Sequence, residues 1–281
     1  MTRKARIIRK GLLLGALYII LTLGGIAMAF PFFWMVSTSL KSEVAIFEYP
    51  PVFFPYPPAW RNYVEVFIRQ PLARALLNSV KIAVINTVGT LFTSSLAAYS
   101  FAKIRFRFKN QLFLILLATM MIPGQVTLIP IFVWFQRLGW VDTHLPLIVP
   151  ALLCNAYGVF LLRQFFMTIP DSLGESAKID GASQFTVFFR IMLPLCVPAL
   201  TTLGLFSFMG NWNSFMGPLI YLNSVDKFTV PLMLRLFSNH YYADWSMLMT
   251  VACESVAPVI IMYIFMQRFF IKGVVMSGLK S

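Results

Sequence analysis

The sequence predicts an all-α integral membrane protein with six transmembrane helices. Hydrophobic residues make up 59% of its 281 positions and charged residues only 12%, about half of the roughly 25% that soluble domains contain. The mean hydropathy is +0.77. The apolar residues gather in long uncharged runs rather than in short alternating strands, which is typical of a chain whose solvent is lipid.

Six stretches are long enough to cross a bilayer, which takes about 20 apolar residues. Each of the first five is built on an uncharged run, and the sixth carries a charge only at Glu254. Pro123-Gly124 in the third span and Pro258 in the sixth predict kinks, because proline removes a backbone donor. We expect one transmembrane domain over 1–281, with spans near 12–36, 78–102, 110–134, 144–166, 192–221 and 246–268.

The distribution of basic residues predicts the orientation of these spans. With the N-terminus in the cytoplasm, fifteen of the 23 Lys and Arg residues fall on the cytoplasmic side and seven outside, as the positive-inside rule requires. Both termini are therefore expected in the cytoplasm. A cleaved leader is the alternative for the basic N-terminus, but the uncharged run from Gly11 to Leu40 is longer than the apolar part of a signal peptide.

Several other classes of protein do not fit. The net charge of +13 could suggest nucleic-acid binding, but the basic residues flank apolar runs and form no patch interleaved with aromatic residues. Cys154, Cys196 and Cys253 each lie alone in an apolar segment, so we expect small buried side chains and no metal site. His144 and His240 fall in predicted outer loops, and no G-x-S-x-G or H-E-x-x-H motif occurs, so we expect no enzyme.

A short polar segment between the fourth and fifth spans has the pattern of a helix at the membrane surface. Ser172 and Glu175 predict a capping box, in which each side chain satisfies a backbone donor of the other residue. Gly181 suits a left-handed C-terminal cap, and a second capped stretch begins at Ser183. We expect a helix over about 172–181, which by its capping alone could be a plain connector.

Residues in and after this helix keep a characteristic spacing: Glu175, Ser176, Ala177, Gly181, Ile191, Leu193 and Pro194. This pattern resembles the EAA motif of ABC importer permeases, with Ser176 in place of the usual second alanine. Much of the remaining chain is similar to the maltose-type carbohydrate permeases, including the stretch from Asn211 to Leu219 in span five. In that family the motif forms a cytoplasmic coupling helix, which docks into the ATP-hydrolysing subunit.

The resemblance implies one permease subunit of a binding-protein-dependent importer for a sugar or oligosaccharide, in the bacterial cytoplasmic membrane. It also implies a second homologous permease, a pair of cytoplasmic ATPase subunits and an extracytoplasmic solute-binding protein. No G-x-x-x-x-G-K-[ST] loop occurs, so we expect ATP and Mg on the ATPases and no cofactor on this chain. The implied ATPase contact consists of Glu175, Ser176, Ala177, Lys178, Asp180 and Gly181.

A sugar path needs hydroxyl and amide partners and aromatic faces, without charges that would trap the cargo. Span two carries a polar stripe at mostly three- and four-residue spacing, and spans four and five add amide and aromatic side chains. The same groups could instead hold helices together, because such residues hydrogen-bond between membrane helices. Both interpretations stay open. The candidate path residues are Asn86, Thr90, Asn155, Tyr157, Asn211, Trp212, Asn213 and Glu254.

Glu254 is expected about 13 Å inside the sixth span, where a carboxylate costs about 2.5 kcal/mol or more unless it faces a partner or water. We hypothesise that it faces the cavity or pairs with a basic group of the neighbouring permease. Lys81 is the only basic residue near a span interior, which favours a neutral cargo over a glycerol-phosphate ester. Amino acids or another small solute remain alternatives. A stand-alone secondary transporter is a further alternative, but it leaves the coupling pattern unexplained.

Overall fold

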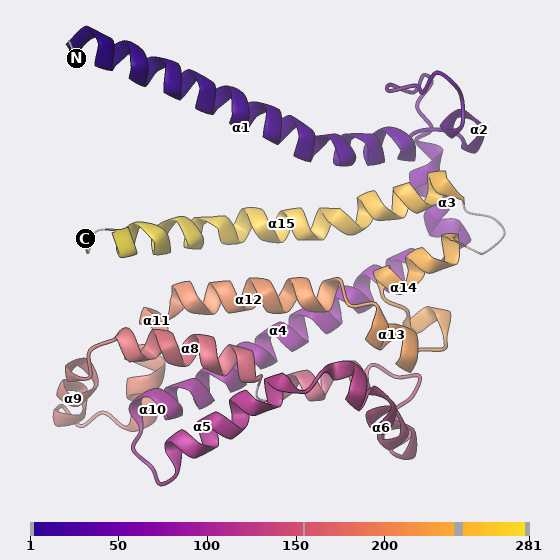
Figure 1. Ribbon diagram of the computed structural model, residues 1–281. Helices are drawn as coiled ribbons and strands as arrows, with labels where there is room; N and C mark the ends of the chain where they lie inside the picture. Colours follow the sequence, from indigo (N-terminus) through magenta and orange to yellow (C-terminus); the bar gives the residue numbers. More distant parts are fainter. Residues whose placement is uncertain (1–2, 154, 239–243, 279–281) are drawn as a thin grey trace. The chain divides into compact units, whose positions relative to one another are not determined.

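The computed structural model describes residues 3–153, 155–238 and 244–278, and every element assigned within these ranges is a helix. Backbone contacts divide the chain into a small unit, residues 1–70 and 234–256, and a large unit, residues 71–233 and 257–281. Figure 1 shows the helices in chain order. The single domain expected over 1–281 stays a prediction. Cys154 and His240, which the sequence singled out, lie outside the described residues.

Four helical stretches of the described residues are long and apolar enough to cross a membrane. They are Gly11–Ser39, Leu72–Lys103, Leu145–Thr168 and Trp245–Phe265. Two bent pairs of helices bring the total to six if each pair makes one crossing. The all-helical membrane class is therefore confirmed, whereas the exact number of six crossings stays a prediction.

The large unit follows the order of the labels in Figure 1. Its elements are α4 (Leu72–Lys103), α5 (Lys109–Ala118), η1 (Thr119–Met121), α6 (Gly124–Arg137), α7 (Leu145–Ile148), η2 (Pro150–Leu152), α8 (Ala156–Thr168), α9 (Ser172–Ile179), α10 (Gln184–Val187), η3 (Phe188–Met192), α11 (Leu193–Leu195), α12 (Val197–Trp212), α13 (Met216–Tyr221), η4 (Val225–Lys227) and α14 (Val230–Leu234). Helix α15 (Trp245–Gly278) begins in the small unit and ends in the large one.

Helices α4, α8 and α12 pack against one another and carry the core of the large unit (Figure 1). Their close approach depends on Gly158, because a Cβ there would lie 2.8 Å from Ser94 Oγ and 3.1 Å from Leu203 Cδ2. Small residues permit such backbone approach between membrane helices. The core consists mainly of Ala98, Tyr99, Val159, Leu162, Phe166, Phe188, Met192 and Leu203.

The predicted third span is broken rather than kinked. Its two halves, Lys109–Met121 and Gly124–Arg137, meet at 94°. Pro123 has extended backbone angles and precedes the first residue of α6, and its missing N–H cannot continue the preceding helix. The kink predicted at Pro123-Gly124 is therefore a sharp break, and a single crossing over 110–134 stays a prediction.

The predicted fourth and fifth spans are interrupted as well. In the fourth, expected over 144–166, Leu153 and Asn155 have extended backbone angles, and α8 begins at Ala156. The fifth, expected over 192–221, bends by 78° where Gln184–Leu195 meets α12. A π-helical turn, η3, and the prolines at 194 and 198 lie at that bend. Past α12 the chain turns again before α13.

The small unit contains α1 (Arg3–Ser39), α2 (Glu43–Ile46), α3 (Arg61–Arg69) and η5 (Arg235–Phe237), together with the first part of α15. Asn62 on α3 donates to the carbonyls of Ser39 at 2.8 Å and Lys41 at 2.9 Å, which closes the end of α1. The Ser39 and Tyr63 hydroxyls lie 2.9 Å apart. In contrast, none of the apolar window of α1 is buried within the chain.

Candidate functional site

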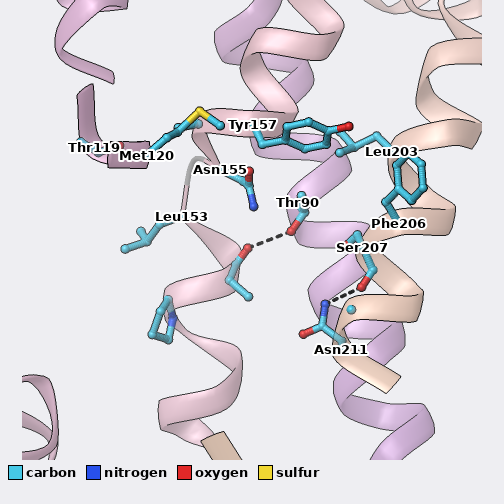
Figure 2. Close-up of a pocket in the computed structure, with 14 residues that line it drawn as sticks. Thr90, Thr119, Met120, Leu153, Asn155, Tyr157, Leu203, Phe206, Ser207 and Asn211 are labelled. Carbon is cyan, nitrogen blue, oxygen red and sulfur yellow. Dashed lines mark hydrogen bonds between the residues drawn. The ribbon is translucent and has the colours of Figure 1, made fainter. Parts of the chain in front are cut away.

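A cavity of about 600 Å³ lies between α4, η1, α8 and α12 (Figure 2). This volume falls within the range of small-molecule sites. Among the described residues, no charged side chain lines it. The lining residues are Thr90, Thr119, Met120, Pro150, Ala151, Leu153, Asn155, Ala156, Tyr157, Leu203, Phe206, Ser207, Gly210 and Asn211.

Two interruptions of the membrane helices face this cavity. Thr119 and Met120 come from the end of the first half of the third span, and Leu153 and Asn155 from the gap in the fourth. A helix can leave its regular conformation at membrane depth only where protein or a water-filled cavity satisfies the freed backbone groups. Broken helices of this kind build the binding sites of many membrane transporters. The interruptions therefore support the assignment of this cavity as a candidate site.

Side chains of α4 satisfy carbonyls freed by the gap in the fourth span. Thr90 Oγ1 donates to the carbonyl of Ala151 at 3.2 Å, drawn in Figure 2, and Thr93 Oγ1 lies 3.4 Å from that of Leu153. Thr93 also donates to the carbonyl of Gly89 at 2.9 Å. The polar stripe predicted on span two therefore makes interhelical contacts as well as lining the cavity.

Asn155 and Tyr157 lie at the start of α8 and line the cavity. Asn155 Oδ1 accepts from the backbone N–H of Gly158 at 3.0 Å, which caps the helix. Figure 2 shows Asn155, Tyr157 and Thr90 among the side chains around the cavity. Tyr157 is partly exposed, so it offers an aromatic face and a hydroxyl to a ligand. Asn155 thus both caps α8 and lines the cavity.

Asn86 and Asn211 form a buried amide pair beside the cavity. Asn86 Nδ2 donates to Asn211 Oδ1 at 2.6 Å and to the carbonyl of Leu147 at 2.9 Å. Asn211 Nδ2 in turn donates to the carbonyl of Ser207 at 2.7 Å (Figure 2). Asn86 is only 1% exposed and does not line the cavity. It orients Asn211, which does.

The remaining candidate path residues lie elsewhere. Trp212 is buried and stacks on Phe208, with ring centroids 5.8 Å apart and planes 9° from parallel. Asn213 is the residue that follows α12. Glu254 lies on α15 in the part that belongs to the small unit, and its side chain is half-buried there. The structure thus brings together Thr90, Asn155, Tyr157 and Asn211 from the predicted set.

Several lining residues were missed from sequence. Ser207 lies four residues before Asn211, so the helix period would have placed it on the same face. Gly210 directly precedes Asn211, so the period does not place it on that face. Thr119 lies next to the proline break of the third span, which was predicted only as a kink. Phe206 offers no signal, because an apolar residue in an apolar span carries no information about the face it occupies.

The predicted coupling helix exists as α9. Its Gly174 is buried, and a Cβ there would lie 3.2 Å from Met192 Cε, so the helix rests closely on the start of the fifth span. Gly181 adopts the expected left-handed conformation at φ +84°. The predicted second cap is also present, since Ser183 Oγ accepts from the N–H of Thr186 at 3.2 Å.

The predicted capping box at Ser172 is wrong. Helix α9 has Asp171 as its N-cap, with helical backbone angles and no side-chain cap hydrogen bond. Ser172 is the first residue inside the helix, and its carbonyl accepts from Ser176 Oγ at 2.7 Å. Asp171 instead pairs with Lys103 across to α4. A partner from another helix thus replaces the local cap.

Helix α9 leaves most of the residues named for the ATPase contact open to solvent. Glu175, Ser176, Lys178, Asp180 and Gly181 are exposed, and Ala177 is half-buried. Beside them Ile179 is 87% exposed and Phe185 at the start of α10 is 71% exposed. Exposed apolar groups rimmed by polar ones are typical of protein–protein contact surfaces. We call Ile179, Phe185 and the exposed residues of α9 the coupling surface.

A polar contact closes the opposite part of the large unit. Asp142 accepts from the backbone N–H groups of Asn223 at 3.0 Å and Ser224 at 2.9 Å, from Ser224 Oγ at 2.6 Å and from Lys227 Nζ at 2.8 Å. Hydrogen bonds from Lys227 and Ser224 hold the pKa of the Asp142 carboxyl well below its usual range. Nearby, burial lowers the pKa of His144, whose Nε2 lies 2.8 Å from the carbonyl of Lys227.

No group of three or more His, Cys, Asp or Glu side chains could hold a metal ion among the described residues. Cys196 is buried and Cys253 half-buried, both as free thiols.

The membrane helices are interrupted around an uncharged polar cavity, and a short helix presents apolar side chains to solvent. This combination is typical of a membrane transport subunit.

Comparison with known proteins gives the family. Residues 89–276 match the family described as binding-protein-dependent transport system inner membrane component, and the chain belongs to this family. It is 33% identical to the probable ABC transporter permease protein YurM of Bacillus subtilis (strain 168), over 95% of this chain and 88% of that protein. It is also 33% identical to the arabinooligosaccharides transport system permease protein AraQ of Halalkalibacterium halodurans, over 78% and 79% of the two chains.

The fold is likewise that of a known importer. A chain in the crystal structure of a bacterial ABC transporter involved in the import of the acidic polysaccharide alginate matches with a TM-score of 0.81. The match covers 96% of this chain and 99% of that one at 24% sequence identity, so it shows the fold alone. Together with the family, it establishes the chain as a membrane-embedded permease subunit of an ABC importer.

Proposed function

We propose that this permease subunit passes a neutral sugar or oligosaccharide across the bacterial cytoplasmic membrane. The observation that carries the proposal is the cavity, whose polar groups are hydroxyls, amides and backbone carbonyls, with the rings of Tyr157 and Phe206 beside them. Hydroxyl-rich cargo hydrogen-bonds to such groups and packs its apolar faces on aromatic rings. The relative AraQ, named for arabinooligosaccharide transport, supports the same class of cargo.

The partners and the membrane arrangement are part of the proposal. Six crossings place both termini in the cytoplasm, together with α9. A second homologous permease completes the path, a pair of ATPases binds the coupling surface, and an extracytoplasmic solute-binding protein delivers the cargo. ATP and Mg bind to the ATPases, and this chain hydrolyses nothing. ATP binding then biases the permease pair between two conformations, as any ligand does that prefers one of two states.

The roles of individual residues follow from their positions. Glu175, Ser176, Ala177, Lys178, Asp180 and Gly181 belong to the ATPase contact. Thr90, Asn155, Tyr157 and Asn211 contact the cargo, and Asn86 holds Asn211 in place. For Glu254 the proposal remains that it faces a partner or water, because a carboxylate inside a span is otherwise costly. Glu254→Leu with full transport and assembly would contradict it.

A glycerol-phosphate ester is the alternative cargo, as is another small solute. An anionic cargo needs positive groups in its path, and none of the described residues that line this cavity is basic. A stand-alone secondary transporter is the alternative mechanism. It predicts uptake driven by an ion gradient and no stable complex with an ATPase, and it leaves the exposed Ile179 and Phe185 without a role.

The test is uptake by the complete importer in proteoliposomes, with its binding protein and a panel of neutral sugars, glycerol phosphate and amino acids. We expect ATP-dependent uptake of a neutral sugar, and about a tenfold weaker response in Tyr157→Ala, from the loss of one aromatic face. Tyr263→Ala is the matched control, because Tyr263 is exposed on α15 and does not line the cavity. Uptake of phosphate esters alone, or equal loss in both variants, would contradict the proposal.

A further inference from the structure

The end of α4 is fastened to the segment just before α9. Lys103 Nζ donates to the carbonyl of Ile169 and to Asp171 Oδ1, both at 2.5 Å. The Lys103 side chain is only 9% exposed, although its partner Asp171 is largely open to solvent. The ammonium lowers the pKa of the Asp171 carboxyl through its hydrogen bond and its charge. Lys103 therefore ties the last turn of α4 to the residue that begins the coupling helix.

A second contact fastens α4 to the segment just after α9. The Tyr99 hydroxyl donates to Gln184 Oε1 at 3.0 Å, and Gln184 is the first residue of α10. Tyr99 is 4% exposed. Its ring is held between Phe166 and Phe188, with centroid distances of 6.0 and 5.1 Å. The hydroxyl is therefore presented from a rigid position.

Helix α9 and α4 meet around a cavity rather than through close apolar packing. A cavity of about 440 Å³ separates them, and both contacts form part of its wall. Its lining includes Lys103, Asp171, Tyr99 and Gln184 as well as Glu175 and Lys178 of α9. Helix α9 also packs on Met192 and Val187. The two polar contacts are direct side-chain links between α4 and the segments that flank α9.

The same helix α4 also holds the cargo cavity. Thr90 and Thr93 reach the freed carbonyls of the fourth span, and Asn86 reaches Asn211. From Asn86 to Lys103 a helix rises about 25 Å at 1.5 Å per residue. One uninterrupted helix, without proline between Leu72 and Lys103, thus contacts the base of the coupling surface and the lining of the cavity.

We propose that Lys103 and Tyr99 are positioning residues that transmit movement of α9 to the cargo cavity through α4. The proposal rests on the proposed function. Contiguous contacts of this kind can carry coupling free energy between distant sites when the element has two arrangements. Neither residue contacts cargo or ATPase. Their loss uncouples ATP hydrolysis from sugar uptake, while ATP hydrolysis itself and assembly of the complex are kept.

The experiment measures sugar imported per ATP hydrolysed by the complete importer. For the double variant Lys103→Met, Tyr99→Phe we expect about a tenfold fall in this ratio, with ATPase activity within about twofold of wild type and the complex intact. Arg107→Met is the matched control, because Arg107 is exposed in the loop that follows α4 and lines neither cavity. We expect it to behave as wild type.

A charge exchange separates coupling from folding. Lys103→Asp alone should uncouple the importer, and Lys103→Asp with Asp171→Lys should restore at least half of the wild-type ratio, since the pair is rebuilt in reverse. An unchanged ratio in the double variant, or no restoration by the exchange, would overturn the inference. If the wild-type importer moves no sugar, the proposed function fails first. If the wild-type importer takes up sugar and the variants keep the wild-type ratio of sugar imported to ATP hydrolysed, only this inference is contradicted and the proposed function stands.

Discussion

The two ends of the large unit differ in how far their side chains are satisfied by contacts within the chain. At the end that carries α9 and α10, Ile179 and Phe185 are left in solvent. At the other end, Asp142 is surrounded by donors from the chain itself, including Lys227 at 2.8 Å. Figure 1 shows α4 running from one end to the other. One end thus leaves apolar groups exposed, whereas the other satisfies its charges internally.

The start of α4 shows the same internal closure. Arg74 pairs with Asp226, and Asn78 Nδ2 donates to the carbonyls of Asp226 at 2.9 Å and Phe228 at 3.1 Å. These groups are largely exposed, so each contributes little stability. Under the proposed function, the difference teaches that assembly with the ATPase depends on the α9 end, while the contacts at the other end act only within the subunit.

The strongest way to break this comparison is Ile179→Asp. A charge at the most exposed apolar position of the coupling surface should weaken ATPase binding by about 2 kcal/mol or more, about thirtyfold. The stability of the subunit alone should not change, because the side chain packs on almost nothing within the chain. Co-purification with the ATPase and thermal unfolding of the subunit in detergent measure the two effects.

Ile179→Val is the control, because it keeps the surface apolar and should bind the ATPase as wild type does. If Ile179→Asp assembles normally, the coupling surface is not the ATPase contact. If it unfolds the subunit, Ile179 belongs to the core, and the contrast between the two ends disappears.

A smaller effect is expected in the middle of the unit, at Gly158. Gly158→Ala places a Cβ 2.8 Å from Ser94 Oγ and 3.1 Å from Leu203 Cδ2, so α8 must move away from α4 or α12. Such overpacking costs about 1–3 kcal/mol, seen as a lower unfolding temperature. Gly124→Ala is the control, since nothing lies within 4 Å of its Cβ position. Equal stability of the two variants would show that the three helices do not pack as tightly as described.

How much the sequence could predict differs between α9 and the cavity. The coupling helix is continuous in sequence, so its motif, its position and its Gly181 cap could all be predicted. Only its capping box was wrong, and Asp171, the residue at the N-cap, pairs instead with Lys103, which lies 68 positions away. A cap that depends on another helix leaves no local signal.

The cavity could be predicted only in part. Asn155 and Asn211 stand out because amides are rare in apolar spans, and both line it. The gap at Leu153 was missed, since neither proline nor glycine lies at that point. The residues of the polar stripe on span two differ in their surroundings. Thr90 lines the cavity, whereas the hydroxyls of Thr87 and Ser94 are buried without a hydrogen-bond partner. Sequence spacing alone cannot separate these roles.

The smallest predicted effect tests the internally closed end, through Asp142→Asn. Asparagine keeps an acceptor for the backbone N–H groups of Asn223 and Ser224, and it tolerates the left-handed φ of +59° found here. It removes the charge that faces Lys227, and it replaces Oδ2, which accepts from Ser224 Oγ and Lys227 Nζ, by an amide group that cannot accept a hydrogen bond. Because this pair is partly exposed, and therefore screened, the expected loss of unfolding free energy is about 0.5–1 kcal/mol.

The pH dependence gives this last prediction its sign. The pKa of Asp142 is lowered in the folded protein, so its carboxylate stabilises the fold at every pH above its ordinary value near 4. That contribution is lost as pH falls through the lowered pKa of the folded state. The wild type and Asp142→Asn should therefore differ by a constant amount between about pH 5 and 8 and converge only in stronger acid. Unfolding temperatures across this range measure it, and higher salt should narrow the gap. If the two unfolding temperatures differ only near neutral pH, the difference would instead point to His144, whose pKa is lowered by burial. The prediction that the Asp142 carboxylate stabilises this end would then be contradicted.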